Sequence, residues 1–152
     1  MNNNIRLATR LLQFSIAICG CVPVFAGLAG VVYGPHFIDN TMIDDAFINP
    51  INLANINLDS HFRYLSGILL AIGIAFWSLI PSIETKGAQF RMLTLLVFIG
   101  GLGRAVALLH SGTPSHGMLF GLMMELVITP ALCYWQSRIA KPAERAGMQP
   151  AP

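Results

Sequence analysis

The chain has 152 residues, of which 55% are hydrophobic and only 11% are charged, and its formal net charge is +2. A soluble domain of average composition carries about 25% charged residues, so this composition suits lipid better than water. The high apolar content excludes a disordered chain, and the small net charge without a basic stripe argues against nucleic-acid binding. We therefore predict one small polytopic membrane domain over residues 1–152.

Four apolar segments are long enough, or nearly so, to cross a hydrocarbon layer about 30 Å thick. They cover residues 11–33, 62–80, 92–109 and 117–135. Glycine and proline mark the breaks between them, and Pro142 is expected to end the polar extension of the fourth. The pattern predicts an all-α bundle of four transmembrane helices. An outer loop is expected over residues 34–61, and a disordered tail over about residues 142–152.

Apart from interfacial Arg63 and intramembrane Arg104, all the basic residues lie on one side of the predicted membrane. Arg6 and Arg10 precede the first helix, Lys86 and Arg91 lie between the second and third, and Arg138, Lys141 and Arg145 follow the fourth. The outer connections, residues 34–61 and 110–116, contain no Lys or Arg. By the positive-inside rule, both termini are predicted to be cytoplasmic. The predicted location is the bacterial inner membrane, with several passes.

The N-terminal region has a second interpretation. Arg6, Arg10 and the apolar run after them resemble a signal peptide with a cleavage site at residues 24–26. However, the apolar run continues to Tyr33 and is long enough to span the bilayer. This length favours a first transmembrane helix that is retained.

Arg104 and Glu125 fall inside the predicted third and fourth helices. At 1.5 Å per residue, Arg104 lies roughly 10 Å and Glu125 roughly 12 Å below the outer turn that joins these helices. Antiparallel neighbours would therefore hold the two charges at matching depth, and we predict an ion pair. Such a pair either fixes the register of the helices or belongs to a ligand site.

Three further polar residues lie near the outer side. Arg63 can snorkel to the headgroups, pair with Asp59 one turn earlier, or contact an anion. His61 and His110 are solvated interfacial side chains or ligand contacts, and without a metal-binding motif no metal site is predicted. The predicted ligand-binding residues are Arg63, Arg104, Glu125, His61 and His110. Neither a catalytic residue nor a cofactor is predicted.

Several short motifs lie between about residues 57 and 140. They are Arg63-x-x-x-Gly67, Phe98-Ile99-Gly100-Gly101-x-x-Arg104, Gly112-x-Pro114, and Glu125-Leu126 with Pro130. With these motifs the chain resembles a bacterial family of small four-helix membrane proteins classed as a domain of unknown function. More distantly, its layout is similar to that of the DoxX-type four-helix membrane proteins. The resemblance implies a four-helix bundle and no established activity.

The leading functional hypothesis is a non-enzymatic integral membrane protein. It would bind a small amphipathic ligand, such as a lipid or quinone, or a partner membrane subunit, through an outer-facing Arg/Glu pocket. One alternative is a membrane-embedded enzyme, an isomerase or redox accessory protein, that acts on a lipid or quinone. Another is a small transporter that works as a homo-oligomer.

Overall fold

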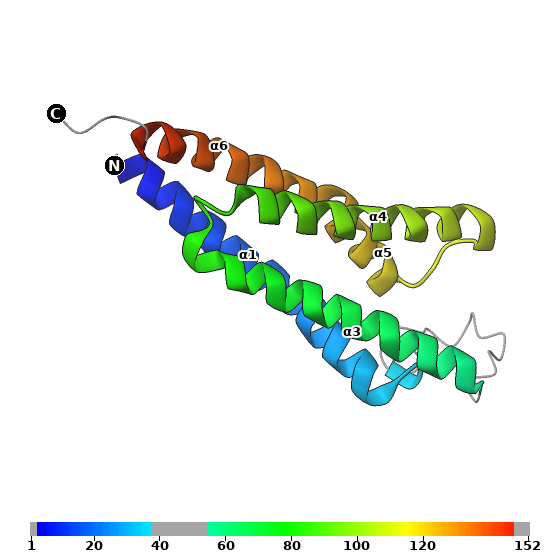
Figure 1. The fold of residues 1–152 in the computed structure, drawn as a ribbon. Helices are drawn as coiled ribbons and strands as arrows, with labels where there is room; N and C mark the ends of the chain where they lie inside the picture. Colours follow the sequence, from blue (N-terminus) through cyan, green and yellow to red (C-terminus); the bar gives the residue numbers. More distant parts are fainter. Residues whose placement is uncertain (1–2, 38–54, 148–152) are drawn as a thin grey trace.

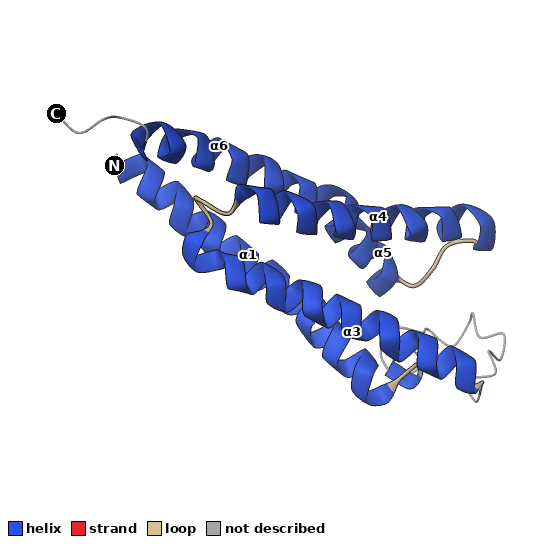
Figure 2. Cartoon of the chain, viewed as in Figure 1, coloured by secondary structure: helices blue, strands red, loops and turns tan. Residues whose placement is uncertain are grey.

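The computed structural model describes residues 3–37 and 55–147, and in these residues it contains helices and short connections but no strand (Figures 1 and 2). The elements in chain order are α1 (Asn3–Tyr33), α3 (Ile56–Leu79), the 3₁₀ turn η2 (Ile80–Ser82), α4 (Gly87–Ser111), α5 (His116–Met123), the π-helical segment η3 (Met124–Ile128) and α6 (Thr129–Gly147). Four helical stretches are long and apolar enough to cross a membrane, namely Ile5–Tyr33, Ile56–Ser82, Gly87–Ser111 and His116–Ala140. The predicted all-α fold with four membrane-spanning helices is confirmed.

The helices extend beyond the apolar segments that revealed them. α1 already begins at Asn3, and α3 begins at Ile56, where the Asn55 side chain accepts hydrogen bonds from the next two free backbone N–H groups. The predicted outer loop therefore ends at residue 55, and its residues 38–54 lie outside the described residues. Hydropathy detects only the apolar part of a helix, whereas a side-chain cap such as that of Asn55 lets a helix begin in polar sequence.

The predicted end of the fourth helix is wrong. α6 passes through Pro142 and continues to Gly147, so residues 142–147 of the expected disordered tail are helical. This stretch is rich in Ala, Glu and Arg, which have high intrinsic helix propensity. The rest of the predicted tail, residues 148–152, lies outside the described residues.

The helices form two antiparallel hairpins. α1 packs along α3, and α4 packs along the continuous run of α5, η3 and α6. The hairpins meet at the end that carries the start of α1, η2 and the end of α6, and they diverge towards the other end (Figure 1). We call these the closed end and the open end of the bundle.

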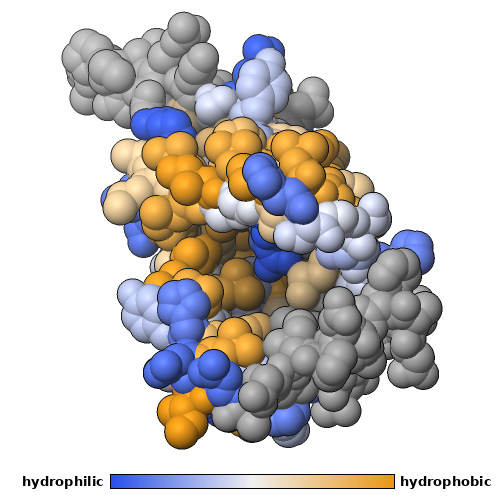
Figure 3. Space-filling model, turned by 90° about the vertical axis from the view of Figure 1, so that its right-hand side faces the viewer, coloured by the Kyte–Doolittle hydropathy of each residue, from blue (hydrophilic) through white to orange (hydrophobic). Residues whose placement is uncertain are grey.

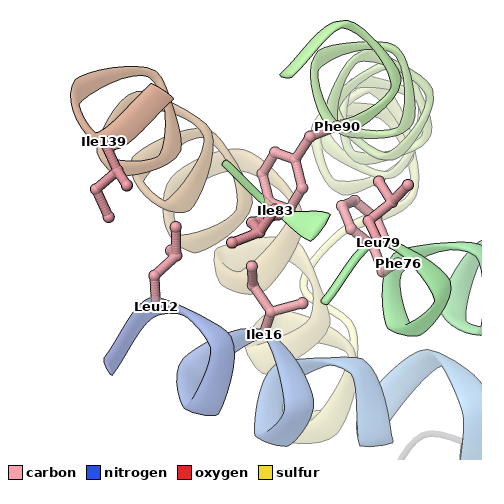
Figure 4. Packing of buried hydrophobic residues seen from close by; sticks show 7 residues of the cluster. All are labelled: Leu12, Ile16, Phe76, Leu79, Ile83, Phe90 and Ile139. Carbon is pink, nitrogen blue, oxygen red and sulfur yellow. The ribbon is translucent and has the colours of Figure 1, made fainter. Parts of the chain in front are cut away.

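A small apolar core holds the closed end together. Its buried side chains come from every long helix and from the turn after η2 (Figure 4): Leu12, Ile16, Phe76, Leu79, Ile83, Phe90 and Ile139. The rings of Phe76 and Phe90 meet edge to face, with centroids 5.2 Å apart, a favourable aromatic geometry. This cluster joins the two hairpins where they converge.

Two glutamines fasten the same turn by hydrogen bonds. Gln13 Nε2 of α1 donates to the Ile80 carbonyl at 2.8 Å, and Gln136 Nε2 of α6 donates to the Ile83 carbonyl at 2.8 Å. Carbonyls at the end of a helix lack intrahelical donors. The two amides supply these donors from opposite hairpins, so the turn is held from both sides.

Candidate functional site

A cavity of about 620 Å³ lies between the two hairpins. Figure 3 looks onto the open end and shows a hollow between mainly hydrophobic walls, with a strongly hydrophilic side chain inside it. Residues of α1, α3, α4, α5, η3 and α6 line the cavity, and most of them are Leu, Ile, Val, Met or Phe. Among the described lining residues, only Arg104 and Glu125 are charged.

Arg104 of α4 and Glu125 of η3 lie in contact across the second hairpin. Arg104 Nε is 3.2 Å from Glu125 Oε1. Arg104 Nη1 lies 3.2 Å from the Met118 sulfur, which is a weak acceptor. The Arg104 side chain is 41% exposed, whereas that of Glu125 is 15% exposed. Both side chains line the cavity, and that of Arg104 is the more exposed of the two.

Two glycines make room for this contact. A Cβ atom at Gly101 would lie 2.9 Å from Glu125 Cβ and 2.7 Å from Leu126 Cδ2, and one at Gly121 would lie 3.4 Å from Arg104 Nη1. Backbone approach of this kind requires small residues, as in many membrane helix pairs. Gly101 and Gly121 therefore lie beside the Arg–Glu contact, one in each of the two antiparallel segments.

Glu125 lies in a π-helical segment, where Thr129 N–H and the Thr129 hydroxyl both donate to the Met124 carbonyl. The cause is Pro130, the next residue, which has no N–H and whose ring would collide with the carbonyl four residues earlier. Widening the turn by one residue relieves that collision and shifts the phase of the side chains before it. Single π-turns occur often at functional sites, and this one carries the cavity's only acidic side chain among the described residues.

Arg63 lies elsewhere. It forms a salt bridge with Asp59 at 2.8 Å and donates through Nη1 to the carbonyls of Val31 and Val32 at the end of α1. α1 ends at Tyr33, and the next residue, Gly34, has a φ of +63°, which suits glycine; its missing side chain leaves space for Asp59 and Arg63. Arg63 is not among the lining residues of the cavity. The geometry gives it a capping role and does not bring it together with Arg104 and Glu125.

The two predicted histidines are also outside the cavity lining. His61 is exposed, with its ring centroid 6.5 Å from that of Tyr64. His110 is exposed near the end of α4, with Nδ1 3.0 Å from the Val106 carbonyl. The described residues bring no three His, Cys, Asp or Glu side chains together in an arrangement that could hold a metal ion.

Comparison with known protein families identifies the family to which the chain belongs. The family described as a domain of unknown function, DUF4345, matches residues 11–136. The chain belongs to the DUF4345 family. Its matched region contains all four apolar segments and both charged residues of the cavity. No curated protein and no solved structure matches the chain.

Sequence reasoning missed the apolar part of the site. Met118, Phe62 and Phe76 line the cavity together with Arg104, but each has an ordinary apolar residue type within an apolar segment. Thr129-Pro130 was the one available signal, because a proline inside a helical pattern implies a local break in the hydrogen-bond ladder. The cavity itself depends on the angle between the hairpins, which no local pattern encodes.

Proposed function

We propose that this DUF4345 protein binds a small amphipathic molecule in the cavity between its two hairpins. The apolar part of the molecule would lie against the cavity walls, and its polar end would meet Arg104. The volume of about 620 Å³ is within the usual range for ligand sites, which are mostly apolar with a few placed polar groups. The observation that carries the proposal is a guanidinium on an apolar wall whose Nη1, among the described residues, has only a thioether sulfur as its acceptor.

A groove between α3 and α4 supports entry of the ligand from the bilayer. It is lined by Ile68, Ala71, Ile72, Ala75, Leu93 and Leu96. Ile68, Ile72 and Leu96 also line the cavity, so the groove and the cavity adjoin. An apolar solute dissolved in the membrane would reach Arg104 by this route without crossing the headgroup region.

The proposed setting is a bacterial inner membrane, with the closed end of the bundle at the cytoplasm. All the Lys and Arg residues outside Arg63 and Arg104 are expected there, and the Arg104–Glu125 contact would then lie within the bilayer. A membrane enzyme that acts on a lipid or quinone would use the same cavity, with Glu125 as its acid or base. A partner membrane subunit or an oligomeric transporter would use the outer surface of the helices. No observation favours these three alternatives over ligand binding.

A matched pair of glycines provides the test. Gly100 lines the cavity and Gly103 does not, and a Cβ at either position would meet nothing within 4 Å. Gly100→Leu should fill part of the cavity, whereas Gly103→Leu on the same helix should not. The variants are purified in mild detergent, and co-purifying small molecules are identified by mass spectrometry.

The expected result is a molecule that co-purifies with the wild type and with Gly103→Leu but is lost from Gly100→Leu. Equal retention in both variants, with thermal stability unchanged, would show that the cavity is not the binding site.

A further inference from the structure

The charge of the cavity is balanced within the cavity itself. One guanidinium and one carboxylate lie 3.2 Å apart, and no other Lys, Arg, Asp, Glu or His is among its described lining residues. The other arginine that the sequence predicted for this site, Arg63, is paired with Asp59 outside the lining. A ligand head that enters this cavity therefore meets a donor without meeting an excess of positive charge.

The two charged groups differ in how much of each side chain is exposed and in which atoms lack a hydrogen bond. Arg104 is 41% exposed, and its Nη2 makes no hydrogen bond within the described residues. Glu125 is 15% exposed, and its Oε2 is buried without a hydrogen-bond partner among them. A ligand can thus take a hydrogen bond from Arg104, while the less exposed Glu125 acts on the ligand through the charge of its carboxylate.

We propose, on the basis of the ligand-binding function above, that Glu125 is a specificity-determining residue. It makes the cavity select neutral amphiphiles with a hydrogen-bond-accepting head, such as an ester or ketone carbonyl, over amphiphiles with an anionic head. A carbonyl oxygen accepts an N–H from Arg104 and brings no charge. An anion at the same place would lie close to Glu125 in an apolar surrounding, where repulsion is weakly screened.

The proposal predicts that removal of the carboxylate charge inverts the preference. Glu125→Gln keeps an oxygen that can accept from Arg104 Nε, but it leaves the guanidinium uncompensated. An uncompensated charge a few ångströms away favours an anion by about ten- to a thousandfold, as judged from the pKa shifts that such neighbours cause. The ratio of neutral to anionic ligand bound should therefore fall about tenfold or more.

Two photoreactive probes with the same alkyl chain and the same diazirine measure this ratio. One is a fatty acid methyl ester, which is a neutral acceptor, and the other is an alkyl sulfonate, which is charged at every accessible pH. Each probe is incorporated with the full-length protein into nanodiscs of uncharged lipid. Labelled peptides are then identified and quantified by mass spectrometry. Glu84→Gln is the matched control, because Glu84 accepts a hydrogen bond from Thr9 and does not line the cavity.

The expected result is that the wild type and Glu84→Gln label cavity residues preferentially with the ester, and Glu125→Gln preferentially with the sulfonate. Equal or stronger sulfonate labelling of the wild type would overturn the proposal, and this arm decides even if Glu125→Gln does not fold. An unchanged ratio in a folded Glu125→Gln would overturn it as well. If neither probe labels cavity residues in the wild type, it is the ligand-binding function itself that fails.

Discussion

Arg104 and Glu125 form a salt bridge, with Arg104 Nε 3.2 Å from Glu125 Oε1. In the membrane setting proposed above, the contact would offset the several kcal/mol that an unpaired, unhydrated charge costs at membrane depth. Within the described part of the chain, Glu125 Oε2 has no hydrogen-bond partner, and Arg104 lines the cavity with 41% of its side chain exposed.

A double-mutant cycle should detect the coupling. Arg104→Leu alone leaves Glu125 uncompensated, and Glu125→Leu alone leaves Arg104 uncompensated, so each should destabilise the protein. The double change to Leu should recover part of the loss, with a coupling free energy of about 0.5–3 kcal/mol. The free energy of unfolding is measured in mild detergent for the wild type and the three variants. Strict additivity of the single effects would show that the two side chains are not energetic partners.

Arg63 should behave as a structural residue. Arg63→Gln removes the salt bridge with Asp59 and the charge-assisted hydrogen bonds to Val31 and Val32. The end of α1 then loses donors that its own backbone cannot supply, so Tm should fall while the amount of co-purifying ligand per folded protein stays unchanged. Arg63→Lys keeps a charged donor, so its Tm should lie between those of the wild type and Arg63→Gln. Loss of ligand at unchanged Tm would instead make Arg63 a binding residue.

The sequence predicted the contacts of Arg104 better than those of Arg63, for a physical reason. Arg104 and Glu125 are both close to one tight turn, so their depths follow from the rise per residue. The partners of Arg63 include the Val31 and Val32 carbonyls, which lie more than 30 positions away. Backbone acceptors carry no residue type, so contacts with them leave no trace in the sequence.

At the scale of helices, close approach of α1 and α3 depends on glycines spaced along α1. A Cβ at Gly27 would lie 2.5 Å from Leu70 N and 2.8 Å from the Ser66 carbonyl, both backbone atoms that cannot rotate away. At Gly20 the obstacle would be the Trp77 ring, whose Nε1 donates to the Ala17 carbonyl at 3.1 Å. Gly20 and Gly27, seven residues apart, thus lie on the face of α1 that meets α3.

Substitution of Gly27 should therefore separate the effect of helix packing on Tm from the effect of helix propensity. Ala favours a helix over Gly by about 1 kcal/mol, but at Gly27 the added methyl forces the two backbones apart, which typically costs about 1–3 kcal/mol. Gly27→Ala is expected to lower Tm. Gly103→Ala, where nothing lies within 4 Å of the new Cβ, should leave Tm unchanged or raise it. If the two variants have equal Tm values, the close approach of α1 and α3 contributes nothing to stability.

The π-turn shows where sequence patterns stop being informative within an element. Thr129-Pro130 predicts a disturbance of the fourth helix, but not whether it becomes a kink, a break or a wider turn. Which of these forms depends on how the residues on both sides of the turn pack. Here the side chains of Glu125 and Leu126 pack directly against the backbone of Gly101. The phase of Glu125 towards Arg104 thus depends on a partner in another helix.

At the scale of the whole molecule, the bundle is asymmetric along its axis. Apolar core residues and the two glutamine hydrogen bonds gather at the closed end, whereas the cavity occupies the space towards the open end. Composition and segment length predicted the four helices, because lipid imposes their length and polarity. The splay between the hairpins results from contacts among residues far apart in the chain, so neither the cavity nor its lining followed from the sequence.

Membrane topology gives the last prediction. The start of α1, the η2 turn and the end of α6 lie at the closed end (Figure 1), the end to which the sequence assigns the basic residues that flank the helices. A bias of Lys and Arg orients a membrane protein with that side in the cytoplasm. Reporter fusions after Ala140 and near Lys86 should therefore give a cytoplasmic signal, and a fusion near Asn49 the opposite one. As a control, Lys86→Gln combined with Arg91→Gln should weaken the bias without removing a helix. A fusion after Ala140 that reports the opposite side from one near Lys86 would contradict a bundle whose three basic segments share one end.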